Sequence, residues 1–224
     1  MFLIGNKNNT FEETCLSILD KDSSFELKEA YSNLATNVIY LPIEDKCKKI
    51  AVTSSNYGED KSSVAINLAI ALASTLIDKK VLLVDADLRN SHIGHFLADV
   101  VPGYAMEGGL SEYLSGKDDK CNIKTTHIGN LDVVYAGESP INPAGLINSN
   151  KMNDFIASLD EKYDYVIIDT PPVNTVSDAI LLVGRVNGYI IATKTNYSTV
   201  PMLSSASESL TMVGAQIFGV VLSE

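Results

Sequence analysis

Short apolar runs recur along this chain, and longer segments with helical spacing separate them. Runs of roughly 4 to 8 apolar residues are typical of β-strands, and near-continuous ones are typical of parallel strands that are buried on both faces. We predict strands at residues 49–54, 81–84, 131–135, 165–168, 188–193 and 216–222.

The intervening segments predict helices. In residues 24–41, Leu27, Leu34 and Val38 recur on one face, and Pro42 ends the pattern. This face either packs on the domain edge or also carries a subunit contact. Further helices are predicted at residues 12–19, 61–76, 144–159 and 201–213, with a shorter one inside 108–116.

Alternating strands and helices with short loops predict an α/β fold. We expect a doubly wound, mostly parallel sheet with helices on both faces. At 224 residues the chain can hold one domain with a sizeable core. We place that domain at residues 24–224, after an N-terminal extension at residues 1–23.

A polar loop joins the first strand to the apolar helix, as expected of a phosphate-binding loop. Backbone N–H groups and a helix N-terminus converge there on an anion, Lys61 adds a positive charge, and the hydroxyl of Ser62 can bind Mg²⁺. The pattern G-x-x-x-x-G-K-[ST] is broken at both glycines, which Ser55 and Asp60 replace. The candidate phosphate-binding residues are Ser55, Tyr57, Gly58, Glu59, Asp60, Lys61, Ser62 and Ser63.

Acidic residues follow two of the predicted strands. Asp85 and Asp87, two positions apart, share one face and point into the ligand crevice at the carboxyl end of a parallel strand. Asp169 follows the strand at 165–168 like a Walker B carboxylate, which orders Mg²⁺ or its water. One acid after a strand is more often a solvated turn residue, but the combination with Lys61 indicates a function.

These residues supply what phosphoryl transfer needs: a cation for the phosphates, ligands for the metal, and a carboxylate that accepts a proton. The candidate catalytic residues are Lys61, Asp85 and Asp87. The candidate metal ligands are Ser62, Asp85 and Asp169.

Composition excludes several other classes. A net charge of −11 offers no basic patch for nucleic acid. Three isolated cysteines suit a reducing compartment, and His92 and His95 have no third ligand at zinc spacing. The chain contains no apolar run of the ~20 residues that a membrane span needs, and residues 1–4 are too short for a signal peptide. We therefore expect a cytoplasmic protein.

The motifs resemble those of the bacterial tyrosine kinases of capsule and exopolysaccharide biosynthesis, which are P-loop proteins related to MinD and ParA ATPases. The resemblance covers the chain from about residue 25 to its end. The matching segments are 29–31, 61–62, 84–89, 109–111, 136–137, 142–143, 167–172, 178–179 and 219–222.

The resemblance implies a role for each site residue. Lys61 would bind the β- and γ-phosphates of ATP, and Ser62 would bind Mg²⁺. Asp85 would be the base toward a tyrosine hydroxyl, Asp87 would support the metal and the phosphates, and Asp169 would be the Walker B carboxylate. The family also implies protein tyrosine substrates and a membrane-anchored activator of the polysaccharide co-polymerase type, which recruits the kinase to the inner face of the membrane.

The chain departs from the family at three places. Asp60 replaces the loop glycine, and one unit charge about 5 Å from a phosphate opposes binding by roughly 3 kcal/mol at an effective dielectric near 20. Ser32 and Ala35 replace arginines that help to close a ring of subunits, which weakens the case for that homo-oligomer. The family's C-terminal tyrosine cluster has no counterpart before Glu224.

Three functions follow from these patterns. The first is an ATP-dependent protein-tyrosine kinase that controls polysaccharide synthesis and export. The second is a non-catalytic pseudokinase that acts as a scaffold for the membrane activator. Asp60, the replaced arginines and the missing tyrosines favour it. The third is a ParA- or MinD-like ATPase, but those families carry an additional lysine where this chain has Asn56.

Overall fold

A computed structural model describes residues 2–4, 18–97 and 108–224 of the chain. In these residues one sheet contains eight strands in the order β1-β8-β7-β2-β6-β3-β5-β4. The strands are β1 (Phe2–Ile4), β2 (Lys48–Ser54), β3 (Val81–Asp85), β4 (Lys124–Thr125), β5 (Leu131–Val134), β6 (Tyr165–Asp169), β7 (Gly188–Lys194) and β8 (Ile217–Ser223). Every pair is parallel except β4 with β5.

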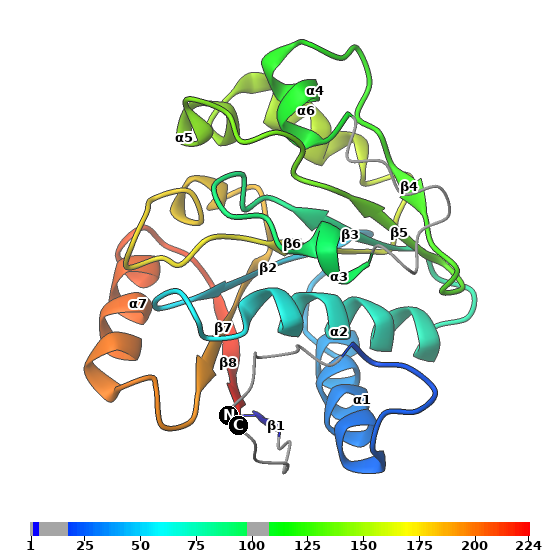
Figure 1. Cartoon of the computed structure of the whole chain (residues 1–224), viewed down its shortest axis with the longest axis vertical. Coiled ribbons are helices and arrows are strands. Elements are labelled where there is room, and N and C mark those ends of the chain that lie inside the picture. The colour runs from blue at the N-terminus through cyan, green and yellow to red at the C-terminus, as the bar shows by residue number, and fades with distance from the viewer. Residues whose placement is uncertain (1, 5–17, 98–107) are drawn as a thin grey trace.

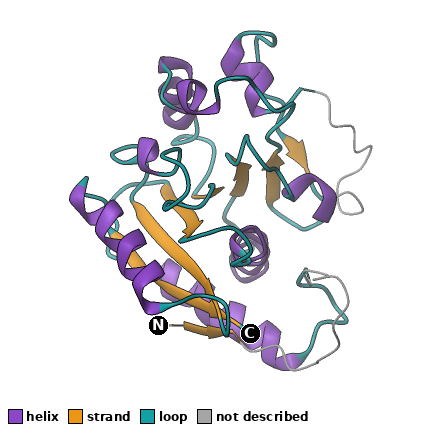
Figure 2. Cartoon of the chain, turned by 60° about the vertical axis from the view of Figure 1, so that its left-hand side comes forward, coloured by secondary structure: helices purple, strands orange, loops and turns teal. Residues whose placement is uncertain are grey.

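Helices cover both faces of the sheet, as Figures 1 and 2 show. They are α1 (Phe25–Ile39), α2 (Lys61–Thr75), α3 (Ile93–Phe96), α4 (Leu110–Ser115), α5 (Pro143–Ile147), α6 (Asn150–Ser158) and α7 (Val200–Met212), with a 3₁₀ turn, η1 (Ile180–Leu182). Alternate residues of β3 pack in opposite directions: Val81 and Leu83 join the core under α1 and α2, whereas Leu82 and Val84 join the core under α4 and α6. The predicted doubly wound fold is confirmed.

One helix prediction is wrong, because residues 144–159 form two helices. The chain leaves the helical path after α5, and the hydroxyl of Ser149 accepts a hydrogen bond from the backbone N–H of Met152 at 3.2 Å, which caps α6. A strong N-cap residue inside an apolar pattern starts a new helix. The short strands β1 and β4 were not predicted, and the predicted helix at 12–19 lies almost entirely outside the described residues.

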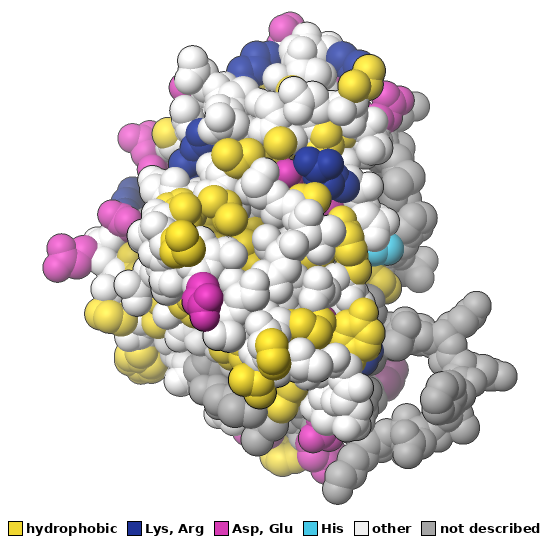
Figure 3. Space-filling view, turned by 90° about the vertical axis from the view of Figure 1, so that its left-hand side faces the viewer, with side chains coloured by type: hydrophobic (Ala, Val, Ile, Leu, Met, Phe, Trp, Pro, Cys, Tyr) yellow, Lys and Arg dark blue, Asp and Glu magenta, His cyan; other side chains and the backbone are white. Residues whose placement is uncertain are grey.

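Helix α7 covers the sheet at β7 and β8 with only part of its surface. Ala206 and Leu210 are buried against the strands, whereas Val200 and Met212 are exposed. Figure 3 looks onto this side and shows several separate apolar side chains on the surface, with a few charged side chains between and around them. None of the helices in the described segments has the length and hydropathy to cross a membrane.

Candidate functional site

The carboxyl ends of three neighbouring strands position the site. Strand β6 lies between β2 and β3, and Asp169 is in register with Val52 on one side and with Asp85 on the other. The loop after β2 leads directly into α2, whose first two residues are Lys61 and Ser62. The loop, the helix N-terminus and two acidic strand ends therefore meet at one edge of the sheet.

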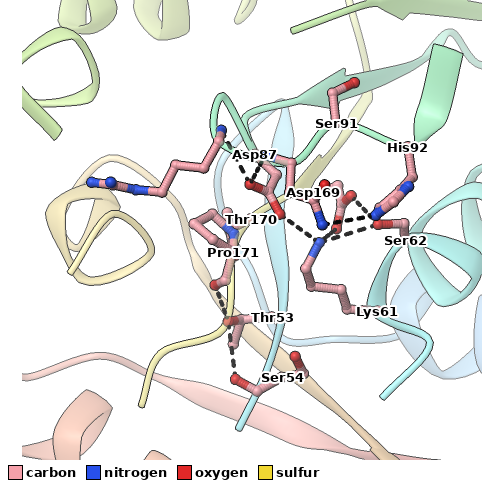
Figure 4. Close-up of polar contacts among 12 residues, drawn as sticks. Thr53, Ser54, Lys61, Ser62, Asp87, Ser91, His92, Asp169, Thr170 and Pro171 are labelled. Atoms are coloured by element: carbon pink, nitrogen blue, oxygen red, sulfur yellow. Dashed lines mark hydrogen bonds and ion pairs between the residues drawn. The ribbon is translucent and has the colours of Figure 1, made fainter. Parts of the chain in front are cut away.

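Lys61 contacts the side chains of other site residues at this edge of the sheet (Figure 4). Its ammonium lies 2.8 Å from Oδ2 of Asp87 and 3.6 Å from Oδ1 of Asp169. It also donates to the hydroxyl of Ser62 at 3.2 Å, and that hydroxyl donates to Oδ2 of Asp169 at 2.6 Å. All four residues are buried. The structure thus brings together side chains that are more than 100 positions apart in the sequence.

Because the cluster is buried, the charges of Lys61 and its neighbouring carboxylates interact strongly. Burial opposes the charge of Lys61, but the carboxylates of Asp169 and Asp87 outweigh it and raise the pKa of the lysine. Burial also raises the pKa of Asp169, although Lys61 and Ser62 act against it. Because Lys61 stays protonated, the site carries one permanent positive charge beside its carboxylates.

Asp85 lies beside the cluster and has a different environment. The hydroxyl of Ser91 donates to its Oδ2 at 2.6 Å, and the backbone N–H of Asp87 donates to its Oδ1 at 3.1 Å. Burial, followed by the charge of Asp169, raises the pKa of Asp85 to about 8. A carboxyl group that titrates near neutral pH can exchange a proton with a reacting group.

An ion pair between two residues that were not predicted for the site holds the loop after β3. Arg89 donates to both carboxylate oxygens of Asp178, at 2.7 and 2.9 Å, and Asp178 is fully buried. The backbone N–H groups of Arg89 and Asn90 donate to Oδ1 of Asp87. Asp178 follows no strand, so only its family motif at 178–179 could have suggested a role.

Two predicted phosphate-binding residues point into the loop itself. The carboxylate of Glu59 is buried and accepts hydrogen bonds from the hydroxyl of Ser55 at 2.7 Å, from the backbone N–H of Asn56 at 2.6 Å, and from the hydroxyl of Ser198. These contacts fix the shape of the loop, so Ser55 and Glu59 can reach a phosphate only through their backbone.

Tyr57, Gly58 and Ser63 complete the predicted loop. The backbone oxygen of Tyr57 accepts a hydrogen bond from the hydroxyl of Tyr197 at 3.0 Å, and Gly58 has a φ of 82° beside the same ring. The hydroxyl of Ser63 accepts from the side chain of Asn67 at 3.4 Å, one turn further along α2. Its side chain is therefore not among those that surround Lys61.

Asp60 does not face Lys61. Its carboxylate lies 3.0 Å from the ammonium of Lys194 and accepts a hydrogen bond of 3.0 Å from the hydroxyl of Ser223. These partners are at the ends of β7 and β8, on one side of β2, whereas Lys61 contacts side chains at β6 and β3 on the other side. The expectation that the charge of Asp60 would oppose phosphate binding did not anticipate this pairing.

A cavity of about 320 Å³ opens beside the loop. The loop residues from Tyr57 to Ser62 line one side, and Asn90, His92 and Phe96 line another. The last three were not predicted as site residues, although they follow Asp87 on the same connection. The amide of Asn90 lies 3.0 Å from Nε2 of His92, and both side chains face this cavity.

The oxygen atoms of the cluster fit a hard divalent cation. Oδ2 of Asp87 and Oδ1 of Asp169 are buried and face the ammonium of Lys61, and no other donor in the described part of the chain reaches them. Within the described ranges, no three His, Cys, Asp or Glu side chains are grouped as metal ligands. Mg²⁺ commonly takes one or two protein oxygens together with water and substrate phosphates, so this donor set is compatible with it.

Comparisons with known proteins identify relatives of this chain. A family model described as an AAA domain matches residues 47–213. The tyrosine-protein kinase CpsD of Streptococcus pneumoniae serotype 4 is 36% identical over 212 residues, which cover 93% of this chain and 90% of CpsD. The kinase domain of the Escherichia coli tyrosine kinase ETK superposes with a TM-score of 0.81 at 30% identity, covering 88% of this chain and 75% of that one.

The chain is also similar, at lower TM-score, to a protein solved with a bound nucleotide. The septum site-determining protein MinD of Pyrococcus horikoshii, solved as a complex with Mg-ADP, has a TM-score of 0.63 at 25% identity. The match covers 79% of this chain and 70% of that one. The overall fold is thus common to both kinds of relative.

Proposed function

This chain belongs to the bacterial tyrosine kinase family, and we propose that it transfers the γ-phosphoryl group of ATP to tyrosine hydroxyls of proteins. The observation that carries the proposal is the meeting of Lys61 with Asp87, Asp169 and Ser62 at the ends of β3 and β6. A buried cation, a hydroxyl and carboxylates in contact are the groups that position and neutralise a phosphoryl group.

The nucleotide would lie against the loop between β2 and α2. Backbone N–H groups of the loop and the positive end of the 15-residue helix α2 attract phosphate oxygens. Lys61 would move its ammonium from Asp87 to the β- and γ-phosphates, which keeps its charge paired throughout. The cavity beside Tyr57, Asn90 and His92 leaves room next to the loop for the rest of the nucleotide.

Mg²⁺ would be held by Ser62 and Asp169, and when bound it neutralises charge on the phosphate oxygens. Oδ1 of Asp169 has no hydrogen-bond donor, and the hydroxyl of Ser62 is already 2.6 Å from the other oxygen. Asp87, whose Oδ1 is fixed by backbone N–H groups, has its Oδ2 on the ammonium of Lys61, and this oxygen would be released when Lys61 moves to the phosphates. These residues can serve the metal without a rearrangement of the backbone.

We propose that Asp85 accepts the proton of the tyrosine hydroxyl. A tyrosine hydroxyl loses its proton as its oxygen bonds to the γ-phosphorus and the bond to the β-phosphate oxygen breaks, so ADP leaves. The position of Asp85 suits this acceptance, because its carboxyl group is buried at the end of β3, in register with Asp169. Ser91 holds one oxygen of Asp85 and the N–H of Asp87 holds the other, which fixes its direction.

The test is transfer of labelled phosphate from Mg-ATP to a tyrosine peptide, with the matching phenylalanine peptide as the blank. The cytoplasmic segment of a candidate activator is included in every reaction. We expect Asp85→Asn to lower kcat by about 100-fold or more. Asp78→Asn, an exposed carboxylate at the opposite end of β3, is the matched control and should react like the unchanged chain. Equal incorporation in the Asp85→Asn protein would refute the assignment.

We propose a role in capsular or exopolysaccharide synthesis, with a membrane-anchored activator of the co-polymerase type as partner. Family membership supports both. Ring assembly has less support, because Ala35, where the family carries an arginine, is fully buried against α2. Ser32 remains partly exposed. Stimulation of peptide phosphorylation by the activator segment, measured as a rise in kcat, tests the partner.

A non-catalytic scaffold is the second candidate, and Asp60 in the phosphate-binding loop is the observation that favours it. A negative charge at this position would exclude ATP unless the chain compensates for it. The two candidates differ in one measurable respect. The kinase binds Mg-ADP with Asp60 in place, whereas the scaffold binds it only after Asp60→Gly.

A further inference from the structure

The backbone at Asp60 explains why a glycine is common there and how aspartate can replace it. Asp60 is the N-cap of α2 and has φ 57° and ψ 23°, in the left-handed region. Glycine adopts this region most easily, and aspartate and asparagine are the side chains that tolerate it best. The loop therefore keeps its shape with Asp60, and the remaining difficulty is the charge of the carboxylate.

The chain provides a separate place for that carboxylate. Lys194 is the last residue of β7 and Ser223 is the last of β8, and the two are paired in register. Oδ2 of Asp60 lies 3.0 Å from both the ammonium of Lys194 and the hydroxyl of Ser223. Oδ1 lies 3.3 Å from the same ammonium. The two strand ends thus form one binding position, which we call the Asp60 clamp.

The Asp60 clamp is shielded enough to hold a charge pair. The side chains of Lys194 and Asp60 are 22% and 15% exposed, which is far less than a surface pair such as Lys117 with Glu138 at 63% and 76%. The hydroxyl of Ser223 also lies 3.2 Å from the backbone oxygen of Thr193, so its one proton is shared between that oxygen and Asp60. A partly buried, doubly contacted carboxylate has less freedom to turn toward a phosphate.

We propose that Lys194 and Ser223 are positioning residues of the nucleotide site, which neutralise Asp60 and hold it at the ends of β7 and β8 so that the loop can bind a phosphate. The inference rests on the proposed nucleotide binding. Lys194 acts through Asp60 and does not touch the nucleotide. Its importance therefore depends on the carboxylate, and replacing Asp60 by glycine should make Lys194 dispensable.

The experiment is a cycle of four proteins titrated with Mg-ADP in a calorimeter: unchanged, Lys194→Met, Asp60→Gly, and both changes together. We expect Lys194→Met to weaken binding by about 10- to 100-fold. The carboxylate of Asp60 would then have no cation beside it and would repel a phosphate bound a few ångströms away. In the Asp60→Gly background the same change should alter affinity by less than about twofold. Lys194→Arg, which keeps the cation, should restore most of the loss.

Controls separate this role from a general loss of structure. Lys79→Met removes a lysine that pairs with Asp164 at 2.8 Å at the amino end of β3, and it should leave ADP affinity unchanged. Ser223→Ala is the milder change to the clamp and should weaken binding by roughly threefold to tenfold through the loss of one charged hydrogen bond. Thermal unfolding of each free protein identifies any variant that does not fold.

Each outcome decides the proposal. A loss on Lys194→Met that disappears with Asp60→Gly supports it. An equal loss of ADP affinity in both backgrounds would overturn it, because Lys194 would then contact the nucleotide itself. No loss of affinity in either background would also overturn it, although nucleotide binding would stand. If Mg-ADP binds only to proteins that carry Asp60→Gly, the unchanged loop does not bind nucleotide, and the role of Lys194 fails with it. If none of the four proteins binds Mg-ADP, the proposed nucleotide site itself is refuted.

Discussion

At the scale of single residues, this chain buries carboxylates in three ways. Asp87 and Asp169 share the ammonium of Lys61, which can later turn to a phosphate. Asp85 has a hydroxyl and a backbone N–H as its hydrogen-bond donors, and its pKa rises to about 8. Glu112 is held by backbone N–H groups. The first arrangement leaves one oxygen of each carboxylate with no donor other than Lys61. The second gives a carboxyl group an unusual pKa, and the third is structural.

Glu112→Gln tests the structural arrangement. The backbone N–H of Gly109 donates to Oε2 of Glu112 at 2.8 Å, and the backbone N–H of Glu138 donates to Oε1 at 2.9 Å. An amide offers one acceptor and turns an NH₂ group toward the other donor, so we expect a loss of about 1–3 kcal/mol in the free energy of unfolding at pH 7. Urea unfolding measures it.

The pH dependence of that loss follows from the pKa of Glu112. Burial raises this pKa, but the backbone hydrogen bonds outweigh burial and hold it below its usual value. Its contribution to stability is therefore complete above the ordinary glutamate pKa of about 4.3 and is lost as the pH falls through the lower folded-state pKa. The difference between unchanged and Glu112→Gln proteins should shrink in that acidic range. A difference that grows on acidification would contradict the assignment.

At the scale of elements, the site depends on how the connection after β3 is anchored. Arg89 ties this connection to Asp178, just before η1, and the same connection carries Asp87 and Ser91. The backbone of Arg89 and Asn90 in turn orients the carboxylate of Asp87. The ion pair therefore joins two loops that follow neighbouring strands, β3 and β6.

Asp178→Asn should loosen this anchor. Asparagine keeps one acceptor but removes the charge that pairs with Arg89, so Asp87 and Asp85 are held less accurately. We expect kcat for peptide phosphorylation to fall about tenfold, because small misplacements of reacting groups are costly. Binding of Mg-ADP should change by less than about threefold. A fall in ADP affinity that matches the fall in kcat would show that the loop acts on binding instead.

The break between α5 and α6 makes a second prediction at this scale. Ser149→Ala removes the hydroxyl that caps α6 and should lower the free energy of unfolding by about 1 kcal/mol. Ser205→Ala, at an exposed position inside α7, is the matched control and should change stability by less than about 0.5 kcal/mol. Equal effects of the two changes would mean that Ser149 does not act as a cap.

The sequence predicts the main strands and the acidic strand ends, because apolar runs and the residues that follow them are local features. Asp85, Asp87 and Asp169 could be placed at one edge for this reason. The partners of Asp60 could not be predicted, since Lys194 and Ser223 are 134 and 163 positions away. The edge strand β1 was missed because three residues carry too little pattern, and their pairing with β8 is a tertiary contact.

At the scale of the whole molecule, binding at the loop should stabilise the entire fold. The loop follows β2 in the middle of the sheet and begins α2, which packs against α1 and several strands. A ligand that binds only the folded state at 100 times its Kd adds about 2.7 kcal/mol. Saturating Mg-ADP should therefore raise Tm by about 5–10 °C in a domain of this size.

Two controls belong to this thermal measurement. Chelation of Mg²⁺ should remove most of the shift, because the metal and the phosphates bind together. Lys61→Met should abolish the shift at any ADP concentration that can be reached. A shift that survives both changes would place the nucleotide elsewhere on the molecule.

The central claim is that the loop between β2 and α2 binds nucleotide although it contains Asp60. A crystal structure of the chain with Mg-ADP tests it most directly. We predict phosphate density on the loop, the ammonium of Lys61 on a phosphate oxygen, the metal beside Ser62, and Asp60 still on Lys194 and Ser223. Nucleotide density away from the loop, or a phosphate in place with Asp60 released from Lys194, would contradict the account.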